Sequence, residues 1–184
     1  MSVPAGRLRR VPTRDLSPAE ISALRALLWA AFPVGEEGFT EDDWLHALGG
    51  VHFVLDIDDE ILAHASVVER DLHVADASVR TGYVEAVAVE PARQGQGLST
   101  EVMRQVNEHI RSGYELGALG TGSHRFYERL GWQTWRGPSF VRTEDGAIRS
   151  EEDDGYILVL ETPTSPALDF DAPLSCEWRP GDSW

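Results

Sequence analysis

The sequence predicts an α+β protein built on a mixed central β-sheet flanked by helices. Three observations support this fold class. The chain has 184 residues, 42% of them are hydrophobic, and its apolar positions alternate between strand-like and helix-like spacing. The expected order is one strand, two helices, three strands, then a helix, a strand, a helix and further strands. No repeat or low-complexity linker interrupts the order, so we expect a single domain over residues 1–184.

The first three elements follow from local signals. Residues 7–11 favour a strand that ends at Pro12. Segment 17–20 supplies an N-cap serine, a proline at the first helical position and the glutamate of a capping box, so a helix begins there and ends near Pro33. A second, shorter helix is expected from Thr40, with an acidic residue three positions on.

The remaining elements follow from hydrophobic periodicity. An acidic turn at 58–60 joins two strands, and a Val/Ala-rich strand comes later. A long amphipathic helix then ends at Gly113. The expected strands lie at 51–56, 61–69, 79–89, 115–119, 132–135, 156–161 and 174–178, and the helices at 98–111 and 123–130.

Composition excludes several classes of protein. A net charge of −15 argues against nucleic-acid binding, which depends on neutralising phosphates, and favours a cationic small molecule as partner. The apolar runs are too short to cross a membrane, and no secretory signal is present, so we expect a soluble, cytoplasmic protein. The single cysteine, Cys176, and the spacing of the six histidines indicate no metal site, although His52, His64 and His73 fall on neighbouring strands.

The most informative segment is 83–98, in which an apolar strand leads through a glycine-containing turn directly into a long helix. Backbone N–H groups at a helix start bind anions, and Gly95 and Gly97 let a phosphate approach the backbone closely. Arg93 adds a positive charge. A Gly-x-Gly pair alone is also compatible with a plain strand–helix turn.

This segment resembles the acetyl-CoA-binding motif of the GNAT acetyltransferases. Gly95 and Gly97 match its two small positions, whereas Ala92 stands where the family has Gln or Arg. A second segment, 123–132, is similar to the late family motif, a short helix with a tyrosine that ends in glycine and an aromatic residue. The resemblance implies acetyl-CoA as cofactor, held by Val87, Ala88, Val89, Gln94, Gly95, Gln96, Gly97, Leu98 and Ser99.

Outside these motifs the chain looks like the aminoglycoside 2′-N-acetyltransferases almost from end to end. The similar segments are 39–44, 48–50, 82–85, 116–119, 153–155 and 176–184. This resemblance implies direct transfer of acetyl from acetyl-CoA to the 2′-amine of an aminoglycoside in a ternary complex, and hence antibiotic resistance. It also implies a homodimer.

Two residues are candidates for the chemistry. By resemblance Glu85 accepts the amine proton through water, and partial burial would raise the pKa of such a carboxylate toward neutrality. Its other interpretation is a carboxylate on a solvated strand face. Tyr127 is the candidate acid that protonates the departing CoA thiolate, and its other interpretation is a packed aromatic residue beside Phe126.

The resemblance also supplies candidates for binding the cationic acceptor, for which carboxylates are natural ligands. Other interpretations are helix capping for Asp43, a solvated loop for 151–154 and a disordered tail for Asp182. The tail also carries Trp178, Pro180 and Trp184, which favours docking. The expected substrate-binding residues are Asp43, Glu85, Ala86, Gly120, Asp153, Asp154, Asp182 and Trp184.

Two alternative functions stay open at this point. One keeps the chemistry but changes the acceptor to a polyamine, a cell-wall amino sugar or a protein N-terminus. The other is a non-catalytic module that sequesters cationic drugs, which the presence of both Glu85 and Tyr127 disfavours.

Overall fold

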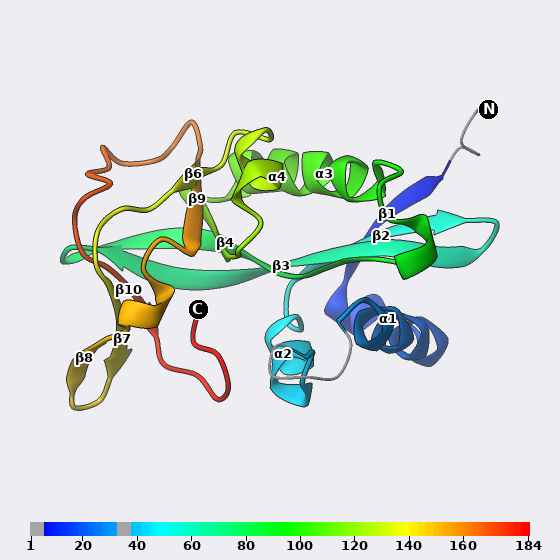
Figure 1. Ribbon diagram of the computed structural model, residues 1–184, viewed down its shortest axis with the longest axis horizontal. Helices are drawn as coiled ribbons and strands as arrows, with labels where there is room; N and C mark the ends of the chain where they lie inside the picture. The colour runs from blue at the N-terminus through cyan, green and yellow to red at the C-terminus, as the bar shows by residue number, and fades with distance from the viewer. Residues whose placement is uncertain (1–5, 33–37) are drawn as a thin grey trace. The chain divides into compact units, whose positions relative to one another are not determined.

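The protein was analysed as a computed structural model, which describes residues 6–32 and 38–184. The chain divides into two compact units: the first is Met1–Val68 with Val84–Val106, and the second is Glu69–Tyr83 with Asn107–Trp184. Three elements contribute residues to both units (Figure 1): strands β3 (Glu60–Val74) and β4 (Ala77–Val89) and helix α3 (Leu98–Gly113). The single domain expected from the sequence stays a prediction.

An antiparallel set of strands, β1 (Arg7–Pro12), β2 (Val51–Ile57) and the start of β3, forms the sheet of the first unit. Asp58 and Asp59 join β2 to β3 with φ values of 52° and 62°, the conformation of a type I′ hairpin turn. The predicted strands are confirmed. β3 continues well beyond the expected end at residue 69, because it feeds a second set of pairings in the other unit.

Both expected N-terminal helices form, and both begin with the capping box that the sequence indicates. Ser17 caps α1 (Pro18–Ala31) together with Glu20, and Thr40 caps α2 (Glu41–His46) together with Asp43. Pro33, the predicted stop of the first helix, lies outside the described residues.

Helices cover both faces of the sheet in the first unit (Figure 1). Alternation along β2 explains this, because successive side chains point to opposite faces. Val54 joins a buried cluster with Leu24, Leu28 and Trp44 of α1 and α2. Phe53 points to the other face, where the Arg10 guanidinium lies 5.7 Å from its ring and hydrogen-bonds to Gln105 of α3.

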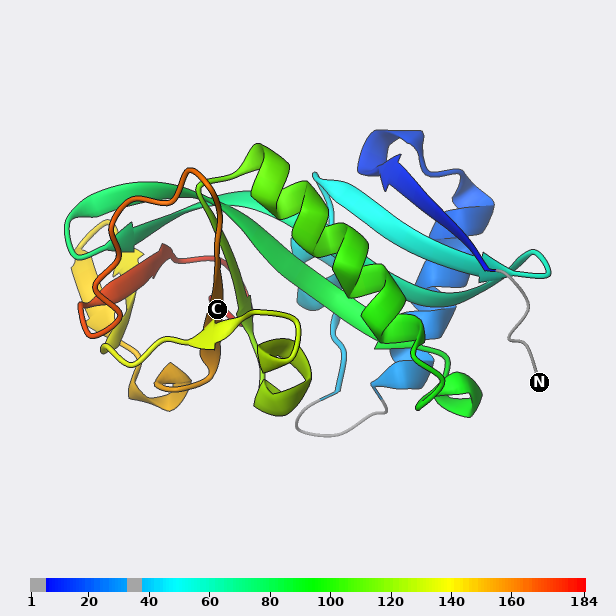
Figure 2. The ribbon, with the colours of Figure 1, turned by 90° about the horizontal axis from the view of Figure 1, so that it is seen from above.

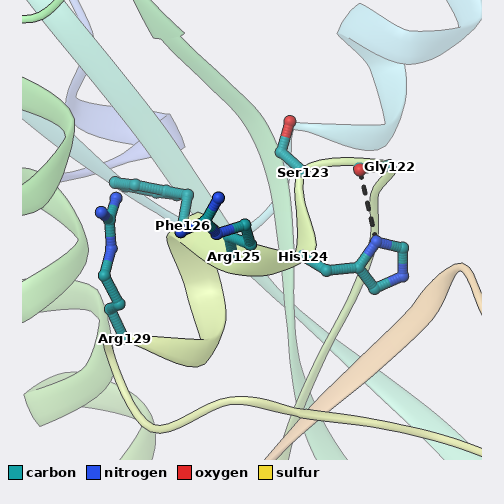
Figure 3. A pocket seen from close by; sticks show the side chains of 6 residues that line it. All are labelled: Gly122, Ser123, His124, Arg125, Phe126 and Arg129. Atoms are coloured by element: carbon teal, nitrogen blue, oxygen red, sulfur yellow. Dashed lines mark hydrogen bonds between the residues drawn. The ribbon is translucent and has the colours of Figure 1, made fainter.

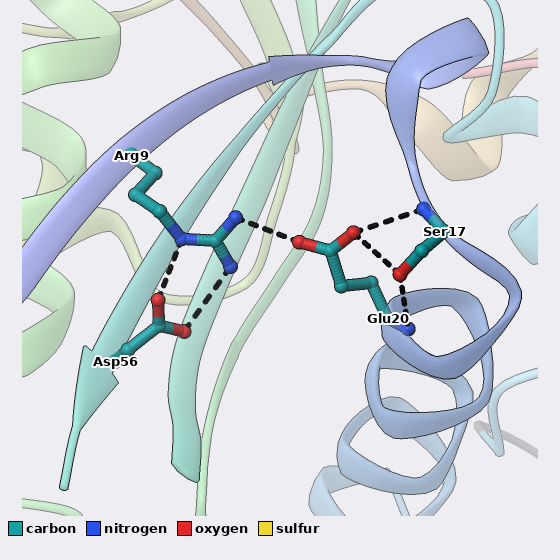
Figure 4. A network of polar contacts seen from close by, with 4 residues as sticks. All are labelled: Arg9, Ser17, Glu20 and Asp56. Carbon is teal, nitrogen blue, oxygen red and sulfur yellow. Dashed lines mark hydrogen bonds and ion pairs between the residues drawn. The ribbon is translucent and has the colours of Figure 1, made fainter. Parts of the chain in front are cut away.

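A polar network joins the first strand, the second strand and α1 (Figure 4). The Arg9 guanidinium donates to Asp56 at 2.6 Å and to Glu20 at 2.7 Å. Glu20 also accepts from the Ser17 amide and hydroxyl. Hydrogen bonds from Ser17 and Arg9 lower the pKa of Glu20 to about 2. The start of α1 is thus tied to the sheet by a charge that persists at any physiological pH.

The strand order β6-β9-β5-β4-β3-β10-β7-β8 runs along one sheet, which β1 and β2 join through the pairing of β2 with β3. β4 pairs with β5 in parallel from Thr81–Leu116 to Tyr83–Ala118, and β10 pairs with β7 in parallel. The pairs β10–β3, β5–β9, β6–β9 and β7–β8 are antiparallel. The predicted α+β class with a mixed sheet is therefore confirmed. The bounds are β5 Leu116–Gly120, β6 Gln133–Thr134, β7 Ser139–Thr143, β8 Gly146–Arg149, β9 Ile157–Glu161 and β10 Leu174–Glu177.

The hairpin of β7 and β8 was not expected from the sequence. β8 is mostly exposed, so it lacks the apolar alternation that marks a strand. Its turn depends on Gly146, whose φ of 122° is accessible only to glycine. β7 is completed by its parallel pairing with β10, in which Ser139 pairs with Leu174, and a local pattern cannot reveal a partner so distant in sequence.

Two helices belong wholly or partly to the second unit. Figure 2 shows α3 as one continuous helix, as its regular apolar spacing predicts, and α4 spans His124–Glu128. Gly117 of β5 allows close packing, because a Cβ there would lie 3.0–3.1 Å from Ile110, Leu160 and Trp132. Within residues 6–32 and 38–184, none of the helices has the length and apolar character needed to cross a bilayer.

Candidate functional site

Strand β4 has an irregular backbone at Ala86, within the segment that the sequence singled out. Its φ of 52° lies in the left-handed region, which costs a non-glycine residue about 1–2 kcal/mol. Two contacts from β3 hold this stretch: His64 Nδ1 lies 2.8 Å from the Ala86 carbonyl oxygen, and the Ser66 hydroxyl donates to the Glu85 carbonyl at 3.4 Å. A left-handed residue interrupts the alternation of a strand and changes the direction of the neighbouring side chains, as a β-bulge does, and this irregularity at Ala86 is called the Ala86 bulge below.

Glu85, the expected base, comes directly before this bulge. Its side chain is half-buried and its Oε1 atom is shielded from solvent. Val84 on one side and Ala88 on the other are buried, whereas Val87 is half-buried like Glu85. The carboxylate therefore stands at the border between core and surface, and its catalytic role stays a prediction.

The expected phosphate-binding turn is exposed and has the geometry of an anion site. Gly95 and Gly97 have φ values of 76° and 85°, and a Cβ at either would meet nothing within 4 Å. α3 begins directly after them, with the Glu101 amide donating to the Gly97 carbonyl. The amides of residues 98–100 therefore have no acceptor inside the helix and are available to an anion, which the helix dipole also favours. This open turn fits the diphosphate of a nucleotide cofactor.

Tyr127 lies on α4 in the second unit and is only 7% exposed. Its ring makes edge contacts with Phe126 and Trp132, at centroid distances of 4.8 and 6.2 Å. Burial raises the pKa of the Tyr127 phenol to about 12, so it keeps its proton at neutral pH. The packed-aromatic interpretation is thus compatible with a group that can donate a proton.

Asn107 of α3 fixes the turn that follows α4. Its side-chain amide donates to the Leu130 carbonyl at 2.9 Å and accepts from the Trp132 indole at 2.9 Å, and the Trp132 amide donates to the Tyr127 carbonyl. Sequence reasoning missed this residue. A buried asparagine on an otherwise apolar helix face was the available signal.

An open pocket lies beside α4 (Figure 3). Its lining comprises Gly122, Ser123, His124, Arg125, Phe126 and Arg129. The two arginines place guanidinium groups at this pocket in a chain whose net charge is −15. The His124 ring nitrogens face two backbone carbonyls, those of Gly122 at 3.3 Å and Gly155 at 2.6 Å. The pocket suits an anionic group, and sequence reasoning did not single out either arginine.

The tail at residues 182–184 docks onto the second unit. Trp184 is 6% exposed, its indole donates to the Ser150 hydroxyl, and its amide donates to Asp182. A Cβ on Gly120 would lie 3.7 Å from the Trp184 carbonyl carbon, so that glycine borders the same place. The expected docking of the tail is confirmed for Trp184. Trp178, which was expected to dock with it, is 61% exposed.

Asp153 belongs to this group, and its neighbour does not. Desolvation, together with the charges of Asp182 and the adjacent acids, raises the pKa of Asp153 to about 6. Asp154 instead pairs with Arg149 and accepts from the Ser139 amide, and these contacts lower its pKa to about 2. The resemblance named both residues, and the structure brings only Asp153 of the two into the cluster with Asp182 and Trp184.

Asp43, in the first unit, caps α2. Its Oδ2 atom accepts from the Thr40 amide and hydroxyl, both at 2.7 Å. The capping interpretation is therefore correct, and a role in substrate binding stays a prediction. In the described parts of the chain, no three His, Cys, Asp or Glu side chains gather as a metal site would require.

Comparison with known proteins agrees with this geometry. The profile of the family described as "Acetyltransferase (GNAT) domain" matches residues 12–135. An aminoglycoside 2′-N-acetyltransferase of Mycolicibacterium fortuitum is 41% identical over 180 residues, which cover 96% of this chain and 91% of that protein.

Solved structures show the same fold. The Escherichia coli GNAT family N-acetyltransferase YhbS, solved in complex with CoA, has a TM-score of 0.65 and 14% identity, with 96% of this chain and 93% of that chain covered. A GCN5-related N-acetyltransferase of Kribbella flavida has a TM-score of 0.58 and 23% identity over 72% of this chain. This chain covers 34%, about a third, of the Kribbella protein's length.

The strand that leads through an exposed glycine turn into a helix is the arrangement that the resemblance to the GNAT acetyltransferases implied. The family match shows that the chain is a GNAT-type acetyltransferase, a class that takes its acetyl group from acetyl-CoA. Within that class, the chain belongs to the aminoglycoside 2′-N-acetyltransferase family.

Proposed function

We propose that the enzyme transfers acetyl from acetyl-CoA to the 2′-amino group of aminoglycosides and thereby confers resistance to them. The observation that carries this proposal is the acidic cluster of the second unit, where Asp153, Asp182 and the docked Trp184 lie together. Aminoglycosides carry several ammonium groups, and a cluster of carboxylates is suited to bind them. The 41% identity to a relative named for this activity supports the same acceptor.

The cofactor contacts follow from the backbone. The amides of residues 94–99 bind the diphosphate, and the backbone of Val87, Ala88 and Val89 pairs with the pantetheine arm as an added strand would. When bound, acetyl-CoA supplies an activated thioester. The protein's own part is to orient it and to manage protons.

Two side chains divide the proton transfers in this proposal. Glu85 accepts the proton of the attacking amine through a water molecule, and Tyr127 donates to the sulfur as negative charge develops there. Asp43, Glu85, Ala86, Gly120, Asp153, Asp182 and Trp184 contact the acceptor, whereas the ion pair of Asp154 with Arg149 gives it an indirect role. The homodimer and the cytoplasmic location stay predictions.

One pair of acceptors tests the proposal directly. We expect thiol release from acetyl-CoA with an aminoglycoside that has an amine at position 2′, and none with the analogue that has a hydroxyl there. NMR of the product should place the acetyl group on the 2′-nitrogen. Turnover with spermidine but not with the 2′-amino aminoglycoside would overturn the assigned acceptor. Drug binding without thiol release would overturn the enzymatic function.

Asp153 should make acceptor binding depend on pH. Its pKa of about 6 means that it is charged at pH 7 and mostly neutral at pH 5, so its attraction for an ammonium group is lost as the pH falls. A charge-assisted hydrogen bond contributes about 1.5–3 kcal/mol, so we expect Asp153→Asn to weaken aminoglycoside binding at pH 7 by about tenfold or more. Calorimetry in the presence of CoA measures this.

The two proteins should differ less at pH 5 than at pH 7, because the wild-type carboxyl is then protonated. Protonation of the ligand itself changes the affinities of both proteins equally. It therefore cancels in the ratio of the wild-type affinity to the variant affinity at each pH. A ratio of affinities that does not change with pH would show that Asp153 does not bind the acceptor.

A further inference from the structure

Two buried histidines form a hydrogen-bonded chain inside the first unit. His52 and His64 are both fully buried, and His52 Nδ1 lies 2.9 Å from His64 Nε2. At the outer end, His52 Nε2 lies 2.8 Å from the Thr13 hydroxyl. At the inner end, His64 Nδ1 lies 2.8 Å from the carbonyl oxygen of Ala86. The chain therefore connects the 3-10 helix Thr13–Asp15 to the bulge of β4.

The partners fix the direction of every hydrogen bond in this chain. The Ala86 carbonyl can only accept, so the proton of His64 is on Nδ1 and its Nε2 must accept from Nδ1–H of His52. A neutral His52 with its proton on Nδ1 has Nε2 free to accept from the Thr13 hydroxyl at 2.8 Å. That hydroxyl also lies 3.3 Å from the Gly50 carbonyl, and its oxygen accepts from the Gly49 amide at 2.9 Å. Both rings are thus Nδ1–H tautomers, and each polar group of the chain has a partner.

Burial keeps both rings neutral. It lowers the pKa of His52 to about 4 and that of His64 to about 3, so neither ring gains or loses a proton near neutral pH. The titratable side chains of this cluster are therefore not proton donors or acceptors in the reaction. Their fixed tautomers make the chain a rigid support.

The supported residue is the strained one. Ala86 holds a left-handed conformation that alanine avoids, and it separates Glu85 from Val87. Such a conformation persists only where surrounding contacts determine it. The hydrogen bond from His64 is a contact of this kind from the core of the unit.

We propose that His64, oriented by His52 and Thr13, is a positioning residue that holds the Ala86 bulge. It thereby fixes the direction of the Glu85 carboxylate and of the Val87 backbone that pairs with the pantetheine arm in the proposed function. This inference rests on the proposed function for its catalytic consequence, but the support of the bulge is a property of the fold alone.

Two nearly isosteric substitutions separate the ends of the His64 ring. In His64→Asn the amide nitrogen takes the place of Nδ1 and keeps the bond to Ala86, whereas His64→Gln places its amide at Nε2 and keeps only the contact with His52. Each variant loses one buried hydrogen bond, so both should lose stability. We expect kcat of His64→Asn to exceed that of His64→Gln by at least tenfold, with KM for acetyl-CoA changed less than threefold. A smaller ratio overturns the proposal.

A second readout needs no activity. Nitrogen-15 NMR of the wild-type protein should show both rings as Nδ1–H tautomers, and the amide signals of residues 85–87 should shift in His64→Gln and not in His64→Asn. An Nε2–H tautomer for His64, or equal shifts in both variants, overturns the inference. If the wild-type protein releases no thiol with any aminoglycoside while the tautomers are as expected, the proposed function fails and the support of the bulge stands.

Discussion

Glu85→Gln is expected to lower kcat for aminoglycoside acetylation by about 10²–10⁴-fold, the usual contribution of a positioned general base. Glutamine keeps the size of the side chain and its hydrogen-bonding capacity but cannot take up a proton. Because glutamine occupies the same space, the residues around the half-buried side chain at position 85 should move little on substitution. Steady-state kinetics at saturating acetyl-CoA measures the loss, which should appear in kcat with a smaller change in the KM of acetyl-CoA.

Glu60→Gln provides the matched control, since it makes the same chemical change at the exposed first residue of β3 in the first unit. It should retain wild-type turnover. If Glu85→Gln also retains it, Glu85 is not the base, and the amine must lose its proton to another group or directly to solvent.

Tyr127→Phe should have the second largest effect, a loss of about 10- to 100-fold in kcat. The pKa of the phenol, about 12, lies well above that of an ordinary thiol, about 8.5, so complete proton transfer to a free thiolate would be unfavourable. Its main contribution is then a hydrogen bond to sulfur as charge develops, which is worth about 1.5–3 kcal/mol. This reasoning predicts a smaller loss than for the base.

The loss should also be constant from pH 6 to pH 9, because the phenol does not titrate there. Tyr114→Phe is the control. The ring of this half-buried tyrosine of the second unit lies under the Arg80 guanidinium and makes an edge contact with His109, outside the proposed machinery. If Tyr127→Phe has no more effect than Tyr114→Phe, the packed-aromatic interpretation of Tyr127 is the correct one.

Local signals in the sequence predicted much of the fold. The capping boxes at Ser17 and Thr40 and the glycine turn before α3 each depend on residues within a few positions of one another, and each formed as expected. The β7–β8 hairpin escaped prediction because its apolar content is low and its pairing with β10 is distant in sequence.

The candidate site was less accessible to sequence reasoning. Nothing in the residue types distinguishes Asp153 from Asp154, because only the position of Arg149 decides which carboxylate is neutralised. The sequence predicts a regular strand at Ala86. Its left-handed φ is seen only in the structure, together with the contact from His64, and His64 is 22 positions away in the sequence. The family resemblance indicated which positions matter, but it could not show how the core supports them.

Asp43 caps a helix and, under the proposed function, also binds the acceptor, and this combination limits how the range of acceptors can change. Its carboxylate is the N3 partner of the capping box of α2, a contribution of about 0.3–1.5 kcal/mol that most replacements would remove. Under the proposed function the same residue also meets the drug. Laboratory evolution toward new antibiotics should therefore rarely alter position 43 alone. Successful lineages should first acquire a mutation that stabilises α2 and so offsets the stability lost when the capping contact is removed.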